Sequence, residues 1–358
     1  MENTQDGQSS RLLRTCLWLL IVGVIITFLI YFRGLLIPLA YAVIISYLIS
    51  EVMALTGRIT INGKPAHWVI RAIIAFLVVM GVIFLVVQII VANVDEIVRK
   101  APEYRAIFND IIAQIGAMTK TEDFSRDFGA RISSMNIEGL ISDVFNSFSV
   151  LSANLFLIII YSIFILLEKN VALTKLRAII KDPRQRGEIE MIVNQINQSI
   201  RQYLSVKTVA SLVTALISYG ILRLFDVDFP VLWAFLIFLF NYIPYIGSMI
   251  ATLLPSFLAV FQFESLLMGF WVFLSIQAVQ TLIGSILEPR FAGRTLNLSP
   301  LVVLLSLSLW GIIWGVVGMA IAVPVTSILV IVLAEFPNTR SVAIILSERG
   351  SVLVLTDD

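Results

Sequence analysis

Long apolar runs separated by short polar segments dominate the chain. A transmembrane helix needs about 20 apolar residues, and six runs are of that order: residues 15–32, 34–55, 72–94, 144–167, 208–225 and 265–287. The first two are separated by Arg33 alone, which predicts a tight helical hairpin. With two longer runs described next, the pattern predicts an all-α polytopic membrane protein with about eight hydrophobic segments.

Two apolar runs, 231–261 and 301–333, are longer than a bilayer requires. As a straight helix the second would extend roughly 50 Å at 1.5 Å per residue. Breaking residues interrupt both runs: Asn241, Pro244, Gly247 and Ser248 in the first, and Gly311, Gly315, Gly318 and Pro324 in the second. An interrupted helix at membrane depth is tolerated where protein or a water-filled cavity provides hydrogen bonds to the backbone N–H and C=O groups that lose their helical partners. Two such segments in one half of a chain point to a transporter's binding site.

The distribution of charged residues predicts which loops of the chain face the cytoplasm. Residues 168–207 carry a large excess of Lys and Arg, which predicts that this basic amphipathic region lies in the cytoplasm. If residues 231–261 cross the membrane once, the loop that contains Arg290 lies outside, against this bias. If they form a re-entrant hairpin, the loop lies inside and the bias is obeyed, so we favour the hairpin.

The remaining polar regions are short. Residues 1–14 are expected to be a cytoplasmic tail, with residues 1–10 disordered, and 336–358 a cytoplasmic C-terminal tail. Residues 95–143, which follow the first three spans (15–94), form a predicted helical extracytoplasmic region. Apolar residues there recur every three or four positions, which is typical of amphipathic helices. A small outer cap and an oligomer contact are both open interpretations of this region.

Composition restricts the possible functions. Hydrophobic residues make up 59% of the 358 positions, charged residues 14%, and mean hydropathy is +0.96. The formal net charge of +1 gives no indication of a nucleic-acid partner. A single Cys16 and a single His67 cannot supply a disulfide framework or a multi-ligand metal site. We therefore expect no metal, no cofactor and no enzymatic activity, because phosphate-binding loops and catalytic triads are also missing from the sequence.

Polar residues near the two broken segments are the candidate site. Gln277 and Gln280 are three positions apart and share a helix face, where amides either join helices or contact a solute. Charges beside apolar runs are costly unless paired. The predicted substrate-path or gating residues are Asn241, Tyr242, Pro244, Gly247, Ser248, Gln277, Gln280, Glu288, Pro289, Arg290, Gly293, Arg294, Gly318 and Pro324.

These motifs resemble the autoinducer-2 exporter family of bacterial permeases. The resemblance rests on NYIPYIG at 241–247, LEPR at 287–290 with GR at 293–294, LSP at 298–300, and WG at 310–311 followed by GM at 318–319 and VP at 323–324. It covers residues 18–335, while 95–143 contains no matching motif. The resemblance implies a multi-pass permease of the bacterial cytoplasmic (inner) membrane that assembles as a homo-oligomer.

The resemblance leaves the substrate open, because members are assigned to signal export and to sodium or lithium exchange for protons. A cation/proton antiporter normally needs a carboxylate at membrane depth, and the predicted spans have carboxylates only near their ends. We therefore expect a secondary transporter for a small polar solute, with export of an autoinducer-2-type quorum-sensing signal as one case. The alternatives are a monovalent cation/proton antiporter that uses Glu288 as its coupling carboxylate, and a non-transporting membrane scaffold.

Overall fold

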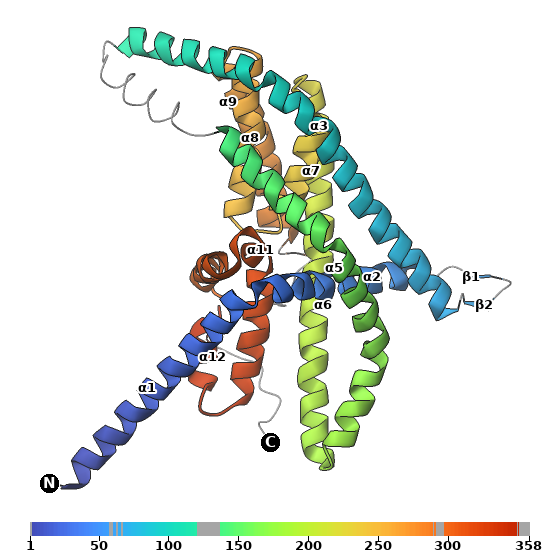
Figure 1. The fold of residues 1–358 in the computed structure, drawn as a ribbon, viewed down its shortest axis with the longest axis vertical. Helices are drawn as coiled ribbons and strands as arrows, with labels where there is room; N and C mark the ends of the chain where they lie inside the picture. The colour runs from blue at the N-terminus through green and yellow to red at the C-terminus, as the bar shows by residue number, and fades with distance from the viewer. Residues whose placement is uncertain are drawn as a thin grey trace. The chain divides into compact units, whose positions relative to one another are not determined.

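The structure, a computed structural model, describes residues 2–56, 60–61, 64–65, 67–119, 137–288, 290, 297–348 and 350. It divides into two compact units. Unit 1 comprises Met1–Ile44, Phe156–Val193 and Asn297–Asp358, and unit 2 comprises Ile45–Leu155 and Asn194–Leu296. The molecule is an all-α polytopic membrane protein (Figure 1), apart from the two-residue antiparallel strands β1 (Thr60–Ile61) and β2 (Lys64–Pro65).

The helices of the N-terminal half confirm most predicted spans but extend beyond them. Helices α1 (Glu2–Tyr31) and α2 (Arg33–Thr56) match the first two predicted spans and are separated by Phe32. The tight hairpin predicted for them is wrong, because Phe32 N–H donates to the Phe28 carbonyl at 2.9 Å and Leu36 N–H to the Phe32 carbonyl at 3.0 Å, which continues the helical bonding across the junction. The prediction that residues 2–10 are disordered is wrong, because α1 begins at Glu2. Helix α3 (Trp68–Thr119) joins the third predicted span to the amphipathic segment after it. Helix α5 (Ile137–Ile179) likewise unites the second amphipathic segment with the fourth span.

Helix α6 (Pro183–Leu224) confirms that the basic amphipathic region runs directly into the next span. A short turn at residues 180–182 connects it to α5, and Arg186 closes this turn by donating from Nη2 to the Ile180 carbonyl at 2.9 Å. Arg177 and Glu190 pair across the same turn at 2.8 Å. Beyond residue 200 one face of α6 is buried at helical spacing: Ile200, Tyr203, Leu204, Lys207, Ser211, Thr214, Ala215, Ser218 and Leu222.

The core of unit 2 is formed by α6 and three shorter helices. These are α7 (Pro230–Phe240), α8 (Ile246–Gln262) and α9 (Leu266–Leu282), which continues into a π-helical turn, η1 (Ile283–Leu287). Helix α8 packs against both α7 and α9 (Figure 1). All four helices contribute to one apolar cluster: Ala215, Leu222, Val227, Ile237, Ala251, Ala259, Val272 and Ile276.

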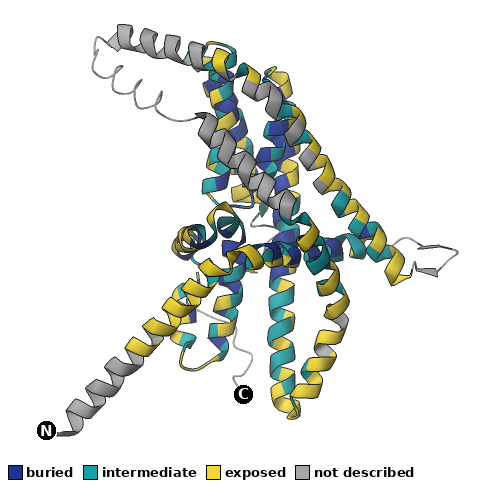
Figure 2. Ribbon diagram, viewed as in Figure 1, coloured by how far each residue is buried: buried dark blue, intermediate teal, exposed yellow. Residues whose placement is uncertain are grey.

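Unit 1 contains the second long apolar run as α11 (Pro300–Glu335), followed by the short α12 (Arg340–Leu346). A β-bridge joins Leu298, two residues before α11, to Ser347, the residue after α12. Helix α1 contacts α11 through Trp314, whose Nε1 donates to the Leu29 carbonyl at 3.0 Å. The described part of α1 is otherwise largely exposed (Figure 2), as expected for a helix that faces lipid.

By length and composition, four helices within the described ranges can cross a membrane: Arg33–Thr56, Pro183–Leu224, Leu266–Leu287 and Pro300–Glu335. Shorter apolar stretches occur at Leu19–Tyr31, Trp68–Val82, Pro230–Phe240 and Ile246–Gln262. Many large apolar side chains on these helices are exposed, which is unfavourable in water and favourable in hydrocarbon. The hydrophobic surface therefore matches a protein embedded in lipid.

Candidate functional site

The segment 231–261 is a hairpin whose two ends meet. Gln262, the last residue of α8, accepts a hydrogen bond from the Asp228 backbone N–H at 2.7 Å. Its Nε2 also donates to the Asp226 carbonyl at 2.7 Å. Helix α7 has 11 residues, about 16 Å at 1.5 Å each, whereas a hydrocarbon core is about 30 Å thick. The two ends of the segment therefore meet, and the predicted hairpin is confirmed; that it re-enters the membrane stays a prediction.

The tip of this hairpin, residues 241–245, is tightly folded. Tyr245 has φ 60° and ψ −63°, and the Ile246 N–H donates to the Pro244 carbonyl at 2.6 Å. These angles define a γ-turn of the positive-φ form, which is rare and strained for a residue with a side chain. The predicted break at Asn241 and Pro244 is confirmed.

Gly247 lets the two arms approach each other at the tip. A Cβ atom on this residue would lie 1.8 Å from the carbonyl oxygen of Phe240, the last residue of α7. The backbone of α8 therefore begins directly against the end of α7, an approach that only glycine permits. Gly247 is accordingly part of the fold of the tip, and Ser248, next to it, donates to the Tyr245 carbonyl at 3.0 Å.

The tip contacts α6 beside a partly buried ion pair. The Tyr242 hydroxyl and Thr208 Oγ1 are 2.7 Å apart. The neighbouring Lys207 donates from Nζ to Glu288 Oε1 at 2.7 Å, and the two side chains are 10% and 26% exposed. Tyr203, one turn before Lys207, is buried.

Sequence reasoning missed Lys207, Thr208 and Tyr203 as site residues. Lys207 is one of many cations in the basic region, and its sequence neighbours do not distinguish it from the Lys and Arg residues that only set the orientation of the chain in the membrane. The usable signal was its position on the apolar face of α6, four residues after Tyr203 and four before Ser211. A lysine on a buried stripe requires a counter-charge, and Glu288 supplies it. The bond places Glu288 at Lys207, the last residue of the basic region.

A π-helical turn immediately precedes Glu288. Residues Ile283–Leu287 form η1, and the Glu288 N–H donates to the Ile283 carbonyl. Such turns insert an extra residue into an α-helix and occur frequently at functional sites. Without the insertion Glu288 would be rotated to another face of α9, so η1 fixes the direction in which its carboxylate leaves the helix.

The second long run is also folded back on itself. Gly315, inside α11, has φ 65° and ψ −144°, which interrupts the helix there. Trp310 Nε1 donates to Thr326 Oγ1 at 3.3 Å, although 16 residues of straight helix would separate them by about 24 Å. A Cβ on Gly318 would lie 1.9 Å from the Trp310 carbonyl oxygen, so this glycine packs against the preceding arm as Gly247 does.

Pro324 was predicted to break this run, and that prediction is wrong. Pro324 is buried within the second arm of α11, and the bend is at Gly315. Proline removes one backbone donor and leaves φ in the helical range, whereas Gly315 adopts a φ that reverses the chain direction. The sharp bend therefore belongs to the glycine.

The other predicted residues are distributed unevenly. Gln280 is buried, whereas Gln277 is half-buried and donates to Thr281 Oγ1 at 3.4 Å, so the two amides do not share one environment. Arg290 is exposed. Pro289, Gly293 and Arg294 lie outside the described residues. Gly318 and Pro324 belong to unit 1 and the α7–α8 tip to unit 2, so a solute path walled by both broken segments stays a prediction.

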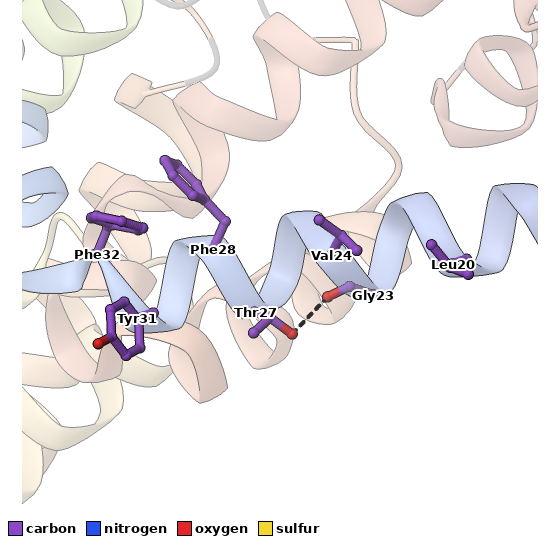
Figure 3. A pocket seen from close by; sticks show the side chains of 7 residues that line it. All are labelled: Leu20, Gly23, Val24, Thr27, Phe28, Tyr31 and Phe32. Atoms are coloured by element: carbon purple, nitrogen blue, oxygen red, sulfur yellow. Dashed lines mark hydrogen bonds between the residues drawn. The ribbon is translucent and has the colours of Figure 1, made fainter.

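A shallow apolar groove on α1 does not coincide with any predicted site residue. Figure 3 shows its lining, which comes from α1 and the residue after it: Leu20, Gly23, Val24, Thr27, Phe28, Tyr31 and Phe32. Thr27 Oγ1 donates to the Gly23 carbonyl at 2.8 Å, so the polar group in the groove is satisfied within the helix. A groove with one helix as its wall encloses no solute, and it suits contact with lipid chains.

Comparison with known proteins decides the family. The profile of the family described as "AI-2E family transporter" matches residues 17–338, which include both folded-back segments and the ion pair. The chain belongs to the AI-2E transporter family. It is therefore related to membrane permeases, in agreement with the predicted resemblance.

The relatives of this AI-2E transporter span nearly its whole length. A putative transport protein of Haemophilus influenzae is 29% identical over 326 residues, covering 87% of this chain and 92% of the relative. The AI-2 transport protein TqsA of Escherichia coli is 28% identical over 315 residues, covering 84% and 89%. A putative transport protein of Borreliella burgdorferi is 29% identical over 317 residues, covering 86% and 83%.

Proposed function

We propose that this protein is a secondary transporter that moves a small polar solute across the bacterial inner membrane, with an autoinducer-2-type signal as a candidate exported substrate. The observation that carries the proposal is the α7–α8 hairpin, whose strained tip contacts α6 beside the Lys207–Glu288 pair. Re-entrant backbone at membrane depth is tolerated where it is buried in protein or lines a cavity. Strain at such a tip is typical of segments that move during function.

The electrostatics of the ion pair support a neutral solute over a monovalent cation. Glu288 is half-buried and Lys207 occupies its carboxylate, so the pair carries no net charge. A sodium or lithium ion would have to displace the Lys207 ammonium, leaving a lysine that is 10% exposed without its counter-charge. An unpaired buried charge is strongly unfavourable, and this cost opposes cation exchange at Glu288.

Transport by purified protein in lipid vesicles tests the proposal. We expect the wild-type protein to accelerate equilibration of radiolabelled autoinducer-2 precursor across the vesicle membrane. Pro244→Ala, which alters the hairpin tip, should slow it, while Pro38→Ala in α2 serves as a proline control away from the tip. Transport unaffected by Pro244→Ala at equal protein levels would contradict a role for the tip.

The same vesicles test the antiporter alternative. A pH-sensitive dye inside them reports proton movement when sodium or lithium is added outside. We expect no protein-dependent signal. A sodium-dependent signal that Glu288→Gln abolishes would replace solute transport by cation/proton exchange as the function.

A further inference from the structure

A single carboxylate joins the base of the α7–α8 hairpin to α3. Asp228 Oδ2 accepts hydrogen bonds from Lys100 Nζ at 2.6 Å and from Tyr104 Oη at 3.0 Å. The Lys100 ammonium also lies 5.4 Å from the centre of the Phe229 ring, within the range of a cation–π interaction. The backbone N–H of Asp228 donates to Gln262 at the end of α8. Asp228 therefore holds α3 and both arms of the hairpin at one point, and we call Lys100, Tyr104, Asp228 and Gln262 the base junction.

The sequence of α3 places this contact on the face that packs against the hairpin. Ile89 precedes Lys100 by about three helical turns and Tyr104 follows by about one, so the three residues share one face of the helix. Ile89 packs against the apolar cluster at the start of α7, and α3 contacts both α7 and α8 (Figure 1). Glu103, on another side of α3, is exposed. The base junction therefore continues the apolar contact between α3 and the hairpin into the polar part of α3.

The backbone at the base of the hairpin is strained on both sides. Asp226 and Phe229, just before α7, have φ of 54° and 56°, and Glu264, just after α8, has φ of 49°. Such angles are unfavourable for residues that carry a Cβ atom and persist only where the surrounding structure imposes them. The base junction supplies these contacts at Asp228, between the two strained residues before α7. Loss of the junction would therefore let the strained backbone relax and α7 pivot at its base.

A small pivot at the base is enough to displace the tip. Helix α7 has 11 residues and is about 16 Å long. Tilting an arm of this length by about 10° moves its far end by roughly 3 Å. At that end the Tyr242 hydroxyl and Thr208 Oγ1 are 2.7 Å apart, and a hydrogen bond is lost beyond about 3.5 Å. The tip therefore keeps its contact with α6 only while the base is fixed.

We propose that Asp228 is a positioning residue, which through the base junction keeps the tip of the α7–α8 hairpin against α6. The polar part of α3 thereby acts as a brace for the hairpin within the same chain. The Lys100 and Asp228 side chains are 35% and 31% exposed, and salt weakens an ion pair of this kind. The position of the tip should therefore respond to ionic strength through this pair. The inference concerns the hairpin that carries the proposed function, and its test does not depend on transport.

Amide hydrogen exchange of the detergent-solubilised full chain, read by mass spectrometry, tests the proposal. Asp228→Asn removes the charge and keeps the shape of the side chain. We expect the amides of the tip, residues 241–247, to exchange at least about threefold faster than in the wild type, because the tip opens more often once the pair is lost. Glu103→Gln on α3 and Glu190→Gln, which breaks the pair with Arg177, are matched controls and should leave the tip unchanged. An unchanged tip in Asp228→Asn, or equal acceleration in either control, would overturn the proposal.

Charge reversal and salt distinguish positioning from a general loss of stability. Lys100→Asp and Asp228→Lys should each accelerate exchange at the tip. The double variant should return the rate to within about twofold of the wild type, because the Tyr104 hydroxyl both donates and accepts and suits either arrangement. Raising sodium chloride from about 0.05 M to about 1 M should accelerate the tip in the wild type and not in Asp228→Asn.

The outcomes of these measurements are separable. A double variant as fast as the single ones, no salt response in the wild type, or an equal response in Asp228→Asn would overturn the positioning role. Faster exchange at the tip of Asp228→Asn with unchanged vesicle transport would uphold that role and reject the part of the tip in the proposed function.

Discussion

Substitution of Gly247 by alanine tests the physical account of the hairpin tip. An alanine Cβ would lie 1.8 Å from the Phe240 carbonyl oxygen, 2.8 Å from its carbonyl carbon and 2.9 Å from Ile243 Cβ. Two of these three atoms belong to the backbone, so no rotamer change can relieve the contact. The start of α8 and the end of α7 must move apart, which disturbs the turn that holds Tyr242 against Thr208.

The expected cost follows from comparison with an unhindered glycine. Forcing an additional carbon into a packed site costs typically about 1–3 kcal/mol. A Cβ atom on Gly220, in α6, would meet no neighbouring atom within 4 Å. Alanine there should stabilise the helix by roughly 0.5–1 kcal/mol, because glycine loses more backbone entropy on folding. The two substitutions are thus expected to act in opposite directions.

Thermal unfolding of the detergent-solubilised protein, followed by tryptophan fluorescence, measures the difference. Gly247→Ala should unfold a few degrees below the wild type, and Gly220→Ala at or above it. Transport in vesicles should fall in Gly247→Ala and stay unchanged in Gly220→Ala. If Gly247→Ala is as stable as Gly220→Ala and transports normally, the close approach at the tip has no role in stability or function.

Three further predictions concern the contacts around the tip. Lys207→Met should lower the free energy of unfolding by about 2 kcal/mol, because it leaves Glu288 half-buried without a partner. The double variant Lys207→Met/Glu288→Met should recover part of this loss in denaturant titrations. Additive losses of the two single variants would contradict a direct pair. Tyr242→Phe and Thr208→Val should each lower the free energy of unfolding by about 1 kcal/mol, because each removes the same hydrogen bond. In a double-mutant cycle, the variant with both changes should lose little more than either single variant. Gln262→Leu should increase amide hydrogen exchange in the loop before α7, with Gln277→Leu as control; unchanged exchange would show that the hairpin closes without these bonds.

Much of the fold follows from the order of apolar residues along the chain. Local features of the sequence predict the spans, the basic region that continues into α6, and the breaks at Asn241 and Gly315. Segment length and helix-breaking residues act within one stretch of chain, so no tertiary information is needed. The motif NYIPYIG likewise marks the hairpin tip without any tertiary information. Residues 2–10 were mispredicted because polarity alone does not prevent a helix from extending beyond a membrane span.

The tertiary structure decided which distant residues meet. The bonds from Gln262 to the loop before α7, which link positions 34 and 36 residues apart, show that segment 231–261 is a hairpin. The partner of Glu288 is Lys207, 81 residues earlier, and the π-helical turn before Glu288 sets the direction of its carboxylate. Such pairings depend on how helices pack and rotate against each other, which hydrophobic periodicity does not encode. The sequence therefore established a broken-helix permease of the membrane, and the packing of α6 against the hairpin and α9 determined where its buried charges and polar groups come together.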